Sequence, residues 1–223
     1  MTRSLATDPP HIRAARRIKA PRRRRGQEEA ARRRLLRLKR RLGLEAGPLP
    51  QLEPGHRIDI VEAPPRRGYV HPLKPSDIRR ALDFFGPIAL YGLQSVELRP
   101  SVGLNANSVP IARLHVPGRV VLFEQPTPPW NLPSLSEESI DRLRRSGASV
   151  EVSIDTVRVK WSPVALKEFV LFEGLMHEIG HHLIQQHAGK RTARVMRTAD
   201  HEKRAAAFAA ACRLMWKRAG HRL

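Results

Sequence analysis

Three residues in the second half of the chain have the types and the spacing of a metal-dependent hydrolase. His177, Glu178 and His181 occur in the order H-E-x-x-H. On a helix, residues four apart share one face, so both imidazoles can bind one Zn²⁺ at about 2.0–2.1 Å. Glu178 is about 100° further round, where its carboxylate can reach a water at the metal. Zinc lowers the pKa of such a water to about 7, and the glutamate can take its proton during attack on a carbonyl.

The surrounding residues predict that this motif lies on a helix entering the hydrophobic core. Residues 169–176, FVLFEGLM, are apolar on nearly every side, and polar groups buried there need partners. Gly174 and Gly180 weaken a helix, which indicates that another element packs closely against its backbone. The competing interpretation is a pair of structural histidines beside an incidental glutamate.

A catalytic zinc ion takes three protein ligands and keeps one open position, and three residues are candidates for the third ligand. His187 follows His181 by six residues, but a continuous helix turns it about 240° away. His201 would give a three-histidine site. Glu202 would add a carboxylate, provided that residues 188–198 let a second helix fold back onto the first.

The motif and the segment after it together resemble the gluzincin metallopeptidases. Residues 202–209, EKRAAAFA, are similar to the glutamate helix of CAAX-type prenyl proteases and their soluble relatives, in which the leading glutamate binds zinc. Glu202 falls on that glutamate, and Phe208-Ala209 on the family's F-A pair. The resemblance covers about residues 150–215. It implies a zinc peptidase with His177, His181 and Glu202 as metal ligands and Glu178 as general base.

The sequence departs from this family at one position. The aspartate four residues after the zinc glutamate, which orients a zinc histidine in the family, is Ala206 here. Asp200 and Glu173 are the candidate replacements. The spacing of His187 is similar to that of metzincins and WLM-type proteases, but their helix-breaking glycine is Ile184 here. A site with His201 would resemble SprT/Spartan-like proteases, whose glycine-rich setting is absent around His201.

The remaining pattern predicts an α+β, zincin-like domain, with a small mixed sheet packed on the long motif helix and the C-terminal glutamate helix. We expect strands at 57–63, 95–99, 112–116, 119–125 and on either side of a reversal at 155–156, and helices at 77–85, 137–147, 162–188 and 199–218. Ser76 is the expected N-cap of the first helix, and Pro117-Gly118 a type II hairpin turn. The order is similar to small gluzincin-like domains, including the ImmA/IrrE group. That resemblance implies an edge strand that holds the peptide, for which 119–125 and 157–161 are candidates.

Charge and proline content divide the chain into three parts. Residues 1–45 are predicted to be a basic, largely disordered arm with a short amphipathic helix at 27–42, residues 46–75 a Pro-rich linker, and residues 76–223 the zincin-like domain. Residues 1–42 hold 16 Lys and Arg against three acids, which is +13 of the total +20. The arm could be solvated or touch the domain, bind nucleic acid through phosphates, or contact an anionic membrane.

The expected function is zinc-dependent hydrolysis of a peptide or protein. The alternatives are a DNA-associated SprT/WLM-like protease or regulator recruited by the arm, and a non-catalytic zincin-fold binding module. A transition-state donor could be Tyr91, His115 or an Arg or His of 187–201, whereas His182, Trp130 and Trp161 are expected to be structural. One cysteine excludes an intrachain disulfide, and the absence of a long apolar run argues against a membrane span. We therefore expect a cytoplasmic protein.

Overall fold

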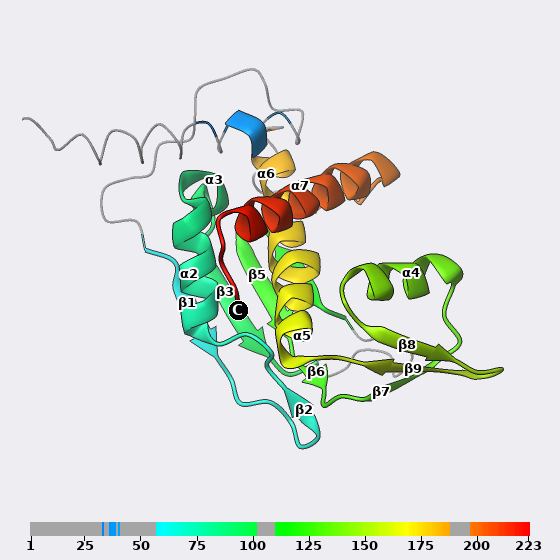
Figure 1. Ribbon diagram of the computed structural model, residues 1–223. Helices are drawn as coiled ribbons and strands as arrows, with labels where there is room; N and C mark the ends of the chain where they lie inside the picture. Colours follow the sequence, from blue (N-terminus) through cyan, green and yellow to red (C-terminus); the bar gives the residue numbers. More distant parts are fainter. Residues whose placement is uncertain (1–32, 34–35, 39, 41–56, 102–109, 188–196) are drawn as a thin grey trace, which may run out of the picture.

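A four-stranded mixed sheet forms the base of the fold in the computed structural model, which describes residues 33, 36–38, 40, 57–101, 110–187 and 197–223 (Figure 1). Its strand order is β1-β3-β5-β4. The strands are β1 (Asp59–Glu62), β3 (Ser95–Arg99), β5 (Arg119–Phe123) and β4 (Ala112–His115). The first three are parallel, and β4 runs antiparallel to β5 at the edge. The prediction of an α+β fold with a mixed sheet is confirmed.

Buried apolar and exposed polar residues alternate along β3, which explains why the helices cover one face of this sheet. Val96 and Leu98 of β3 are fully buried, whereas Glu97 and Arg99 point the other way and share a 2.9 Å hydrogen bond. Since only one face is strongly apolar, helix α2 (Pro75–Phe85) and the long helix that carries the motif pack on it. Helix α7 (Ala199–Arg218) packs on that long helix and on α2, where the rings of Phe85 and Trp216 stack. A short helix, α3 (Pro87–Leu90), leads from α2 into β3.

The predicted hairpin of β4 and β5 is present, but two details differ from expectation. Its turn is not type II: the Gly118 N–H donates to the His115 carbonyl at 3.1 Å, and the Val116–Pro117 peptide between them is cis. Neither candidate peptide-binding strand is an edge. β5 lies between β3 and β4, and β9 (Thr156–Lys160) is the central strand of another sheet. The edge that contacts the motif helix is β4.

A second sheet projects beside the first, with strand order β7-β9-β8 (Figure 1). β7 spans Trp130–Pro133 and β8 Ser149–Val152, and α4 (Glu137–Arg145) connects them. The reversal before β9 is confirmed, since the Ser153 N–H donates to the Thr156 carbonyl and Val157 faces the core. Trp130 and Trp161 pack on each other in the core, as expected. Strands β2 (Tyr69–Val70) and β6 (Gln125–Pro126) form a small third pair.

The motif lies on a long helix that begins as predicted and includes a π-helical segment that the sequence did not predict. The Ser162 hydroxyl accepts from the Ala165 N–H, and Pro163 opens α5 (Pro163–Phe169). A π-helical segment, Val170–Met176, follows and continues directly into α6 (His177–His187). Ala188, the expected end, lies outside the described residues. Helix α7 has its predicted bounds and is capped by Thr198.

Both glycines of this helix are sites of close packing, which confirms the interpretation of the sequence. A Cβ added to Gly180 would lie 3.1 Å from the Ala205 Cα, and one added to Gly174 would lie 2.8 Å from the Ile111 Cγ2. Real Cβ atoms essentially never lie within 3.0 Å of such a neighbouring atom, and 3.1 Å is shorter than nine in ten of their contacts. Gly180 therefore lets the backbone of α7 approach α6 directly, at the level of the motif.

The domain begins before residue 76, so the predicted linker is partly wrong. Within 46–75, β1 pairs with β3, and Ile58 and Leu73 are buried. The N-cap of α2 is Lys74 rather than Ser76, with Pro75 as the first helical residue. Most of the predicted arm lies outside the described residues. Its described part is helical, and the Leu38 side chain, 1% exposed, belongs to the core.

Candidate metal centre

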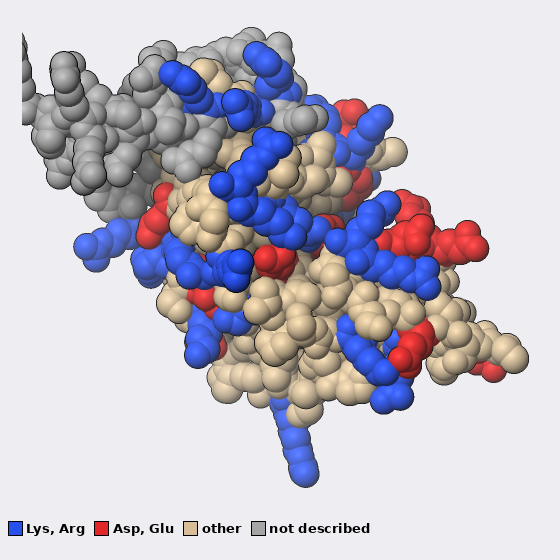
Figure 2. All heavy atoms as spheres, viewed as in Figure 1, with Lys and Arg blue, Asp and Glu red and all other residues tan. Residues whose placement is uncertain are grey.

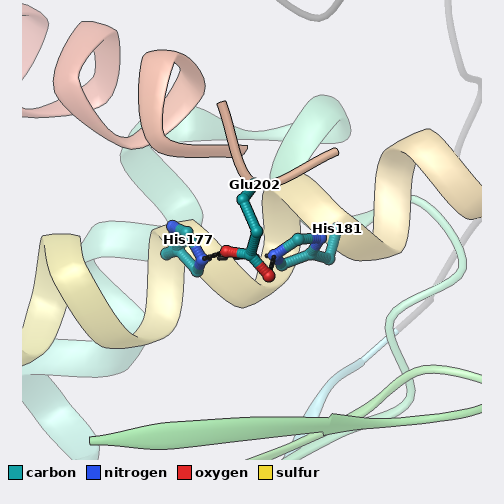
Figure 3. A group of neighbouring side chains, drawn as sticks. All are labelled: His177, His181 and Glu202. Carbon is teal, nitrogen blue, oxygen red and sulfur yellow. Dashed lines mark hydrogen bonds and ion pairs between the residues drawn. The ribbon is translucent and has the colours of Figure 1, made fainter. Parts of the chain in front are cut away.

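Three potential ligand atoms converge where α7 crosses α6 (Figure 3). The two Nε2 atoms of His177 and His181 are 3.2 Å apart. Glu202 reaches between them from α7, with one oxygen 3.2 Å from His177 Nε2 and the other 3.3 Å from His181 Nε2. The His181 side chain is 1% exposed and that of His177 12%, while Glu202 is 41% exposed. The group is therefore buried on the helix side and open on one side.

These separations match what one small metal ion requires. Ligands about 2.0–2.1 Å from a tetrahedral zinc ion lie roughly 3.3 Å from one another. Two imidazole nitrogens and one carboxylate oxygen are also a ligand set typical of catalytic zinc. Within the described residues, His177, His181 and Glu202 are the group that could hold a metal ion. The geometry thus agrees with the ligand set that the gluzincin resemblance implied.

The electrostatics of the group favour the ligand forms of these side chains. Burial, and then the neighbouring His177, lower the pKa of His181, which keeps its imidazole neutral. Burial alone would raise the pKa of the Glu202 carboxyl. The charges of the two histidines and of Arg197 outweigh burial and hold that pKa below its ordinary value. Glu202 is therefore an anion near neutral pH, and a neutral imidazole nitrogen and a carboxylate are what a cation binds.

Local structure explains how Glu202 reaches the histidines. It lies in the first turn of α7, whose start is fixed by Thr198 accepting from the His201 N–H at 3.3 Å. The glycine contact at Gly180 then sets the distance between the two helices. The predicted helical hairpin is thus formed, although residues 188–196, which join its arms, lie outside the described residues.

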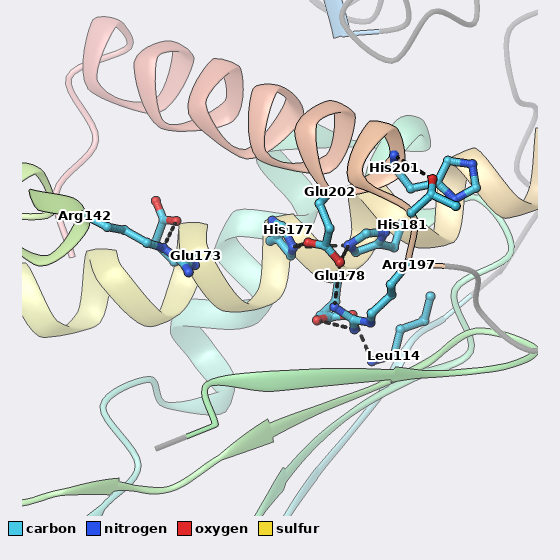
Figure 4. Close-up of polar contacts among 10 residues, drawn as sticks. Leu114, Arg142, Glu173, His177, Glu178, His181, Arg197, His201 and Glu202 are labelled. Atoms are coloured by element: carbon cyan, nitrogen blue, oxygen red, sulfur yellow. Dashed lines mark hydrogen bonds and ion pairs between the residues drawn. The ribbon is translucent and has the colours of Figure 1, made fainter. Parts of the chain in front are cut away.

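Glu178 occupies a separate position beside the ligand group (Figure 4). Its side chain is buried and points toward β4, where it accepts a 3.0 Å hydrogen bond from the Leu114 N–H. Arg197 Nη2 donates to both carboxylate oxygens, at 2.8 and 2.7 Å. Three hydrogen bonds thus hold one carboxylate next to the metal-binding group without making it a member of that group.

Among the described residues, none orients the ring of His177, in keeping with Ala206 in place of the family's aspartate. The His177 Nδ1 is buried and has no hydrogen-bond partner among the described residues. Neither expected replacement supplies one. Glu173 binds Arg142 and Arg213, each at 3.0 Å, and Asp200 is a largely exposed partner of Arg204. Both suggestions from the sequence were therefore wrong.

Three other histidines were considered from the sequence: His201, His187 and His182. His201 donates its backbone N–H to the capping Thr198 hydroxyl and lies outside the metal-binding group (Figure 4). His187 is in the last described turn of α6, and its side chain is outside what the structure describes. His182 is buried, and its Nε2 lies 3.0 Å from the Tyr91 carbonyl, which agrees with the structural role expected for it.

Sequence reasoning missed two contributors, Arg197 and the Leu114 amide. Arg197 was only one of several cations between 187 and 201, and a backbone N–H carries no sequence signal. No described helix is long and apolar enough to cross a membrane. Comparison with protein-family models, curated proteins and solved structures finds no match to this chain.

Proposed function

We propose that this chain is a zinc-dependent peptidase of the gluzincin type, with a zincin-like domain. The observation that carries the proposal is the convergence of His177 Nε2, His181 Nε2 and a Glu202 oxygen within 4.8 Å of one another, with Glu178 beside them. A structural pair of histidines would need neither a carboxylate from a second helix between them nor a further carboxylate held alongside.

The residues have separable roles in hydrolysis. His177, His181 and Glu202 would hold the zinc ion, which when bound polarises a carbonyl and makes water acidic enough to react near neutral pH. Glu178 takes a proton from the attacking water and passes it to the leaving amine. As an anion with a fixed orientation, it is suited to both transfers.

The sheet edge next to the site supports a peptide as substrate. β4 is antiparallel to its only strand neighbour in the described sheet, so its other side can pair with an extended chain. Leu114, in the middle of β4, contacts Glu178 through its amide. A peptide lying along β4 would therefore pass directly by the proton acceptor.

Metal content and cleavage test this proposal together. We expect purified protein to carry about one zinc ion per chain by elemental analysis, and His177→Ala to lose it. His201→Ala is the matched control, because His201 lies next to Glu202 but outside the group, and it should keep the metal. Glu178→Gln should keep the zinc and lose cleavage of unfolded casein.

Two results would contradict the proposal. A Glu178→Gln variant as active as the unmodified protein would exclude this mechanism. A chain that folds without zinc, has no affinity for it and cleaves nothing would favour the non-catalytic binding module instead.

A further inference from the structure

Arg197 connects the proton acceptor of the proposed site to its metal-binding group. Its Nη2 donates to both oxygens of Glu178 at 2.8 and 2.7 Å, and its Nη1 lies 3.4 Å from a Glu202 oxygen. The side chain is 41% exposed, as is that of Glu202, so the guanidinium keeps partial contact with solvent beside the site. In Figure 4 it extends from the start of α7 toward Glu178 and β4.

This position differs from that of an ordinary surface ion pair. Glu178 is 3% exposed, so its charge is expensive to bury without a partner. The guanidinium supplies that partner, and it also sits beside a carboxylate expected to bind the metal. Arg197 helps to keep Glu202 ionised, but a cation so close to a metal site also opposes metal binding electrostatically, so support of the ligand group alone does not account for its position.

We propose that Arg197 is a catalytic residue that donates hydrogen bonds to the substrate oxygen on which negative charge develops, and that it holds Glu178 in place until then. The inference rests on the proposed peptidase function. A carbonyl attacked by water that Glu178 deprotonates must lie next to Glu178 and next to the metal-binding group. The guanidinium spans those two places, and its planar set of N–H donors suits an oxyanion.

The charges change in step during the reaction. As the water oxygen bonds to the carbonyl carbon, Glu178 takes the water proton and becomes neutral, while the carbonyl oxygen becomes negative. Arg197 thus loses its anionic partner as a new anion forms beside it. When the C–N bond breaks, the carbonyl re-forms and Glu178 gives the proton to the amine. Arg197 stays protonated throughout and is neither consumed nor produced.

A tetrahedral anion tests this role without relying on turnover. N-phosphoryl-leucinamide carries charged oxygens like those of the addition intermediate, whereas N-acetyl-leucinamide is a neutral amide. Binding of both is measured by calorimetry on zinc-loaded protein. We expect Arg197→Ala to weaken binding of the phosphoryl compound about 10- to 100-fold and to leave the acetyl compound unchanged. Zinc affinity should stay equal or rise, because a nearby cation is removed.

Arg142→Ala is the matched control. Arg142 lies on α4, is 47% exposed, and pairs at 3.0 Å with Glu173, which is on the long motif helix. This pair lies away from the metal-binding group. The Arg142→Ala variant should bind the phosphoryl compound as tightly as the unmodified protein does. Arg197→Lys keeps the charge without the planar donors and should fall between the two. On casein, Arg197→Ala should lower kcat about 10²- to 10³-fold with little change in KM.

The outcomes separate this inference from the proposed function. Unchanged phosphoryl binding in Arg197→Ala, with zinc retained, overturns the role of Arg197 alone. Loss of zinc from both Arg197 variants also overturns it, because the residue would then support the metal ligands. An unmodified chain that takes up no zinc overturns the peptidase proposal, and this inference with it.

Discussion

At the scale of single residues, the candidate site is complete in its ligands and incomplete in what supports them. His181 and Glu202 have the burial and charges that suit metal binding, and Glu178 has three hydrogen bonds. His177 lacks any described partner for its Nδ1. A ligand histidine is normally oriented by a carboxylate or carbonyl on its other nitrogen, and losing that partner typically costs 10- to 100-fold in affinity or activity.

The missing partner leads to a prediction for Ala206→Asp. Residue 206 is one turn after Glu202 on the same face of α7, and α7 runs toward the start of the motif helix, since Arg213 reaches Glu173. An aspartate there should accept from His177 Nδ1 and raise zinc affinity about tenfold, measured by competition with a chelator.

Ala210→Asp is the control for this change, because it adds the same charge to the same helix one turn further along. Equal zinc affinity in the two variants would show that position 206 does not reach His177.

At the scale of elements, packing rather than hydrogen bonding sets the position of Glu202. α7 approaches α6 at Gly180, where Ala205 and Phe208 fill the space that a side chain would take. The π-helical segment Val170–Met176 lies directly before the motif, and such segments are frequent at functional sites. The two helices thus form one rigid support for three ligands.

We predict that Gly180→Ala separates the two helices and weakens metal binding. The added methyl group would meet backbone at 3.1 Å, so α7 must move, at a cost of about 1–3 kcal/mol in the free energy of unfolding. Zinc affinity should fall about two- to tenfold, because the required shift of a few tenths of an ångström is close to the error of about 0.5 Å that ligand positions tolerate.

Gly174→Ala is a matched test on the same long helix. Its new methyl group would meet the Ile111 side chain at 2.8 Å, outside the metal-binding group. Gly174→Ala should lower the free energy of unfolding by an amount similar to that of Gly180→Ala, as measured by thermal unfolding. It should leave zinc affinity unchanged. Equal losses of zinc affinity in both variants would mean that general destabilisation, not helix spacing, controls the site.

The elements were predictable where local signals were strong. Ser162-Pro163 marked the start of the long helix, the alanine-rich stretch after Thr198 gave α7, and the change of face between Ile154 and Val157 gave a reversal. The edge strand was predicted wrongly, because β5 is the apolar, buried strand of the hairpin, whereas β4 is the more polar one and contains Arg113 and His115. Which of them is interior depends on pairing with β3, a partner distant in sequence.

In the candidate site, too, features that are local in sequence were predictable, and contacts between distant segments were not. His177, Glu178 and His181 are local in sequence and could be found by their spacing, whereas the donor from Leu114 depends on where the sheet meets the helix. The failure of Asp200 and Glu173 as partners of His177 has a similar cause. Each is paired with an arginine that only the folded chain brings near.

At the scale of the whole molecule, the described residues of the basic arm pack against the domain. Arg37 and Arg40 line a groove together with Arg218 of α7, and its apolar wall includes Leu214 and Met215. Lys and Arg side chains gather over α7 on the face seen in Figure 2. Of the interpretations of the arm, the described part favours contact with the domain, which places Arg37 and Arg40 beside Arg218 of α7.

The burial of Leu38 leads to a prediction about the arm. Leu38 is 1% exposed and Leu36 is 51% exposed, although they lie two residues apart on one basic helical segment. We expect Leu38→Ala to lower the free energy of unfolding of the whole chain by about 2–3 kcal/mol in a urea titration. Leu36→Ala should change it by less than about 0.5 kcal/mol. The two substitutions have the same size and helix propensity, so only packing separates them. Indistinguishable urea midpoints would mean that the arm does not pack on the domain in solution, and its charge would then act independently of α7.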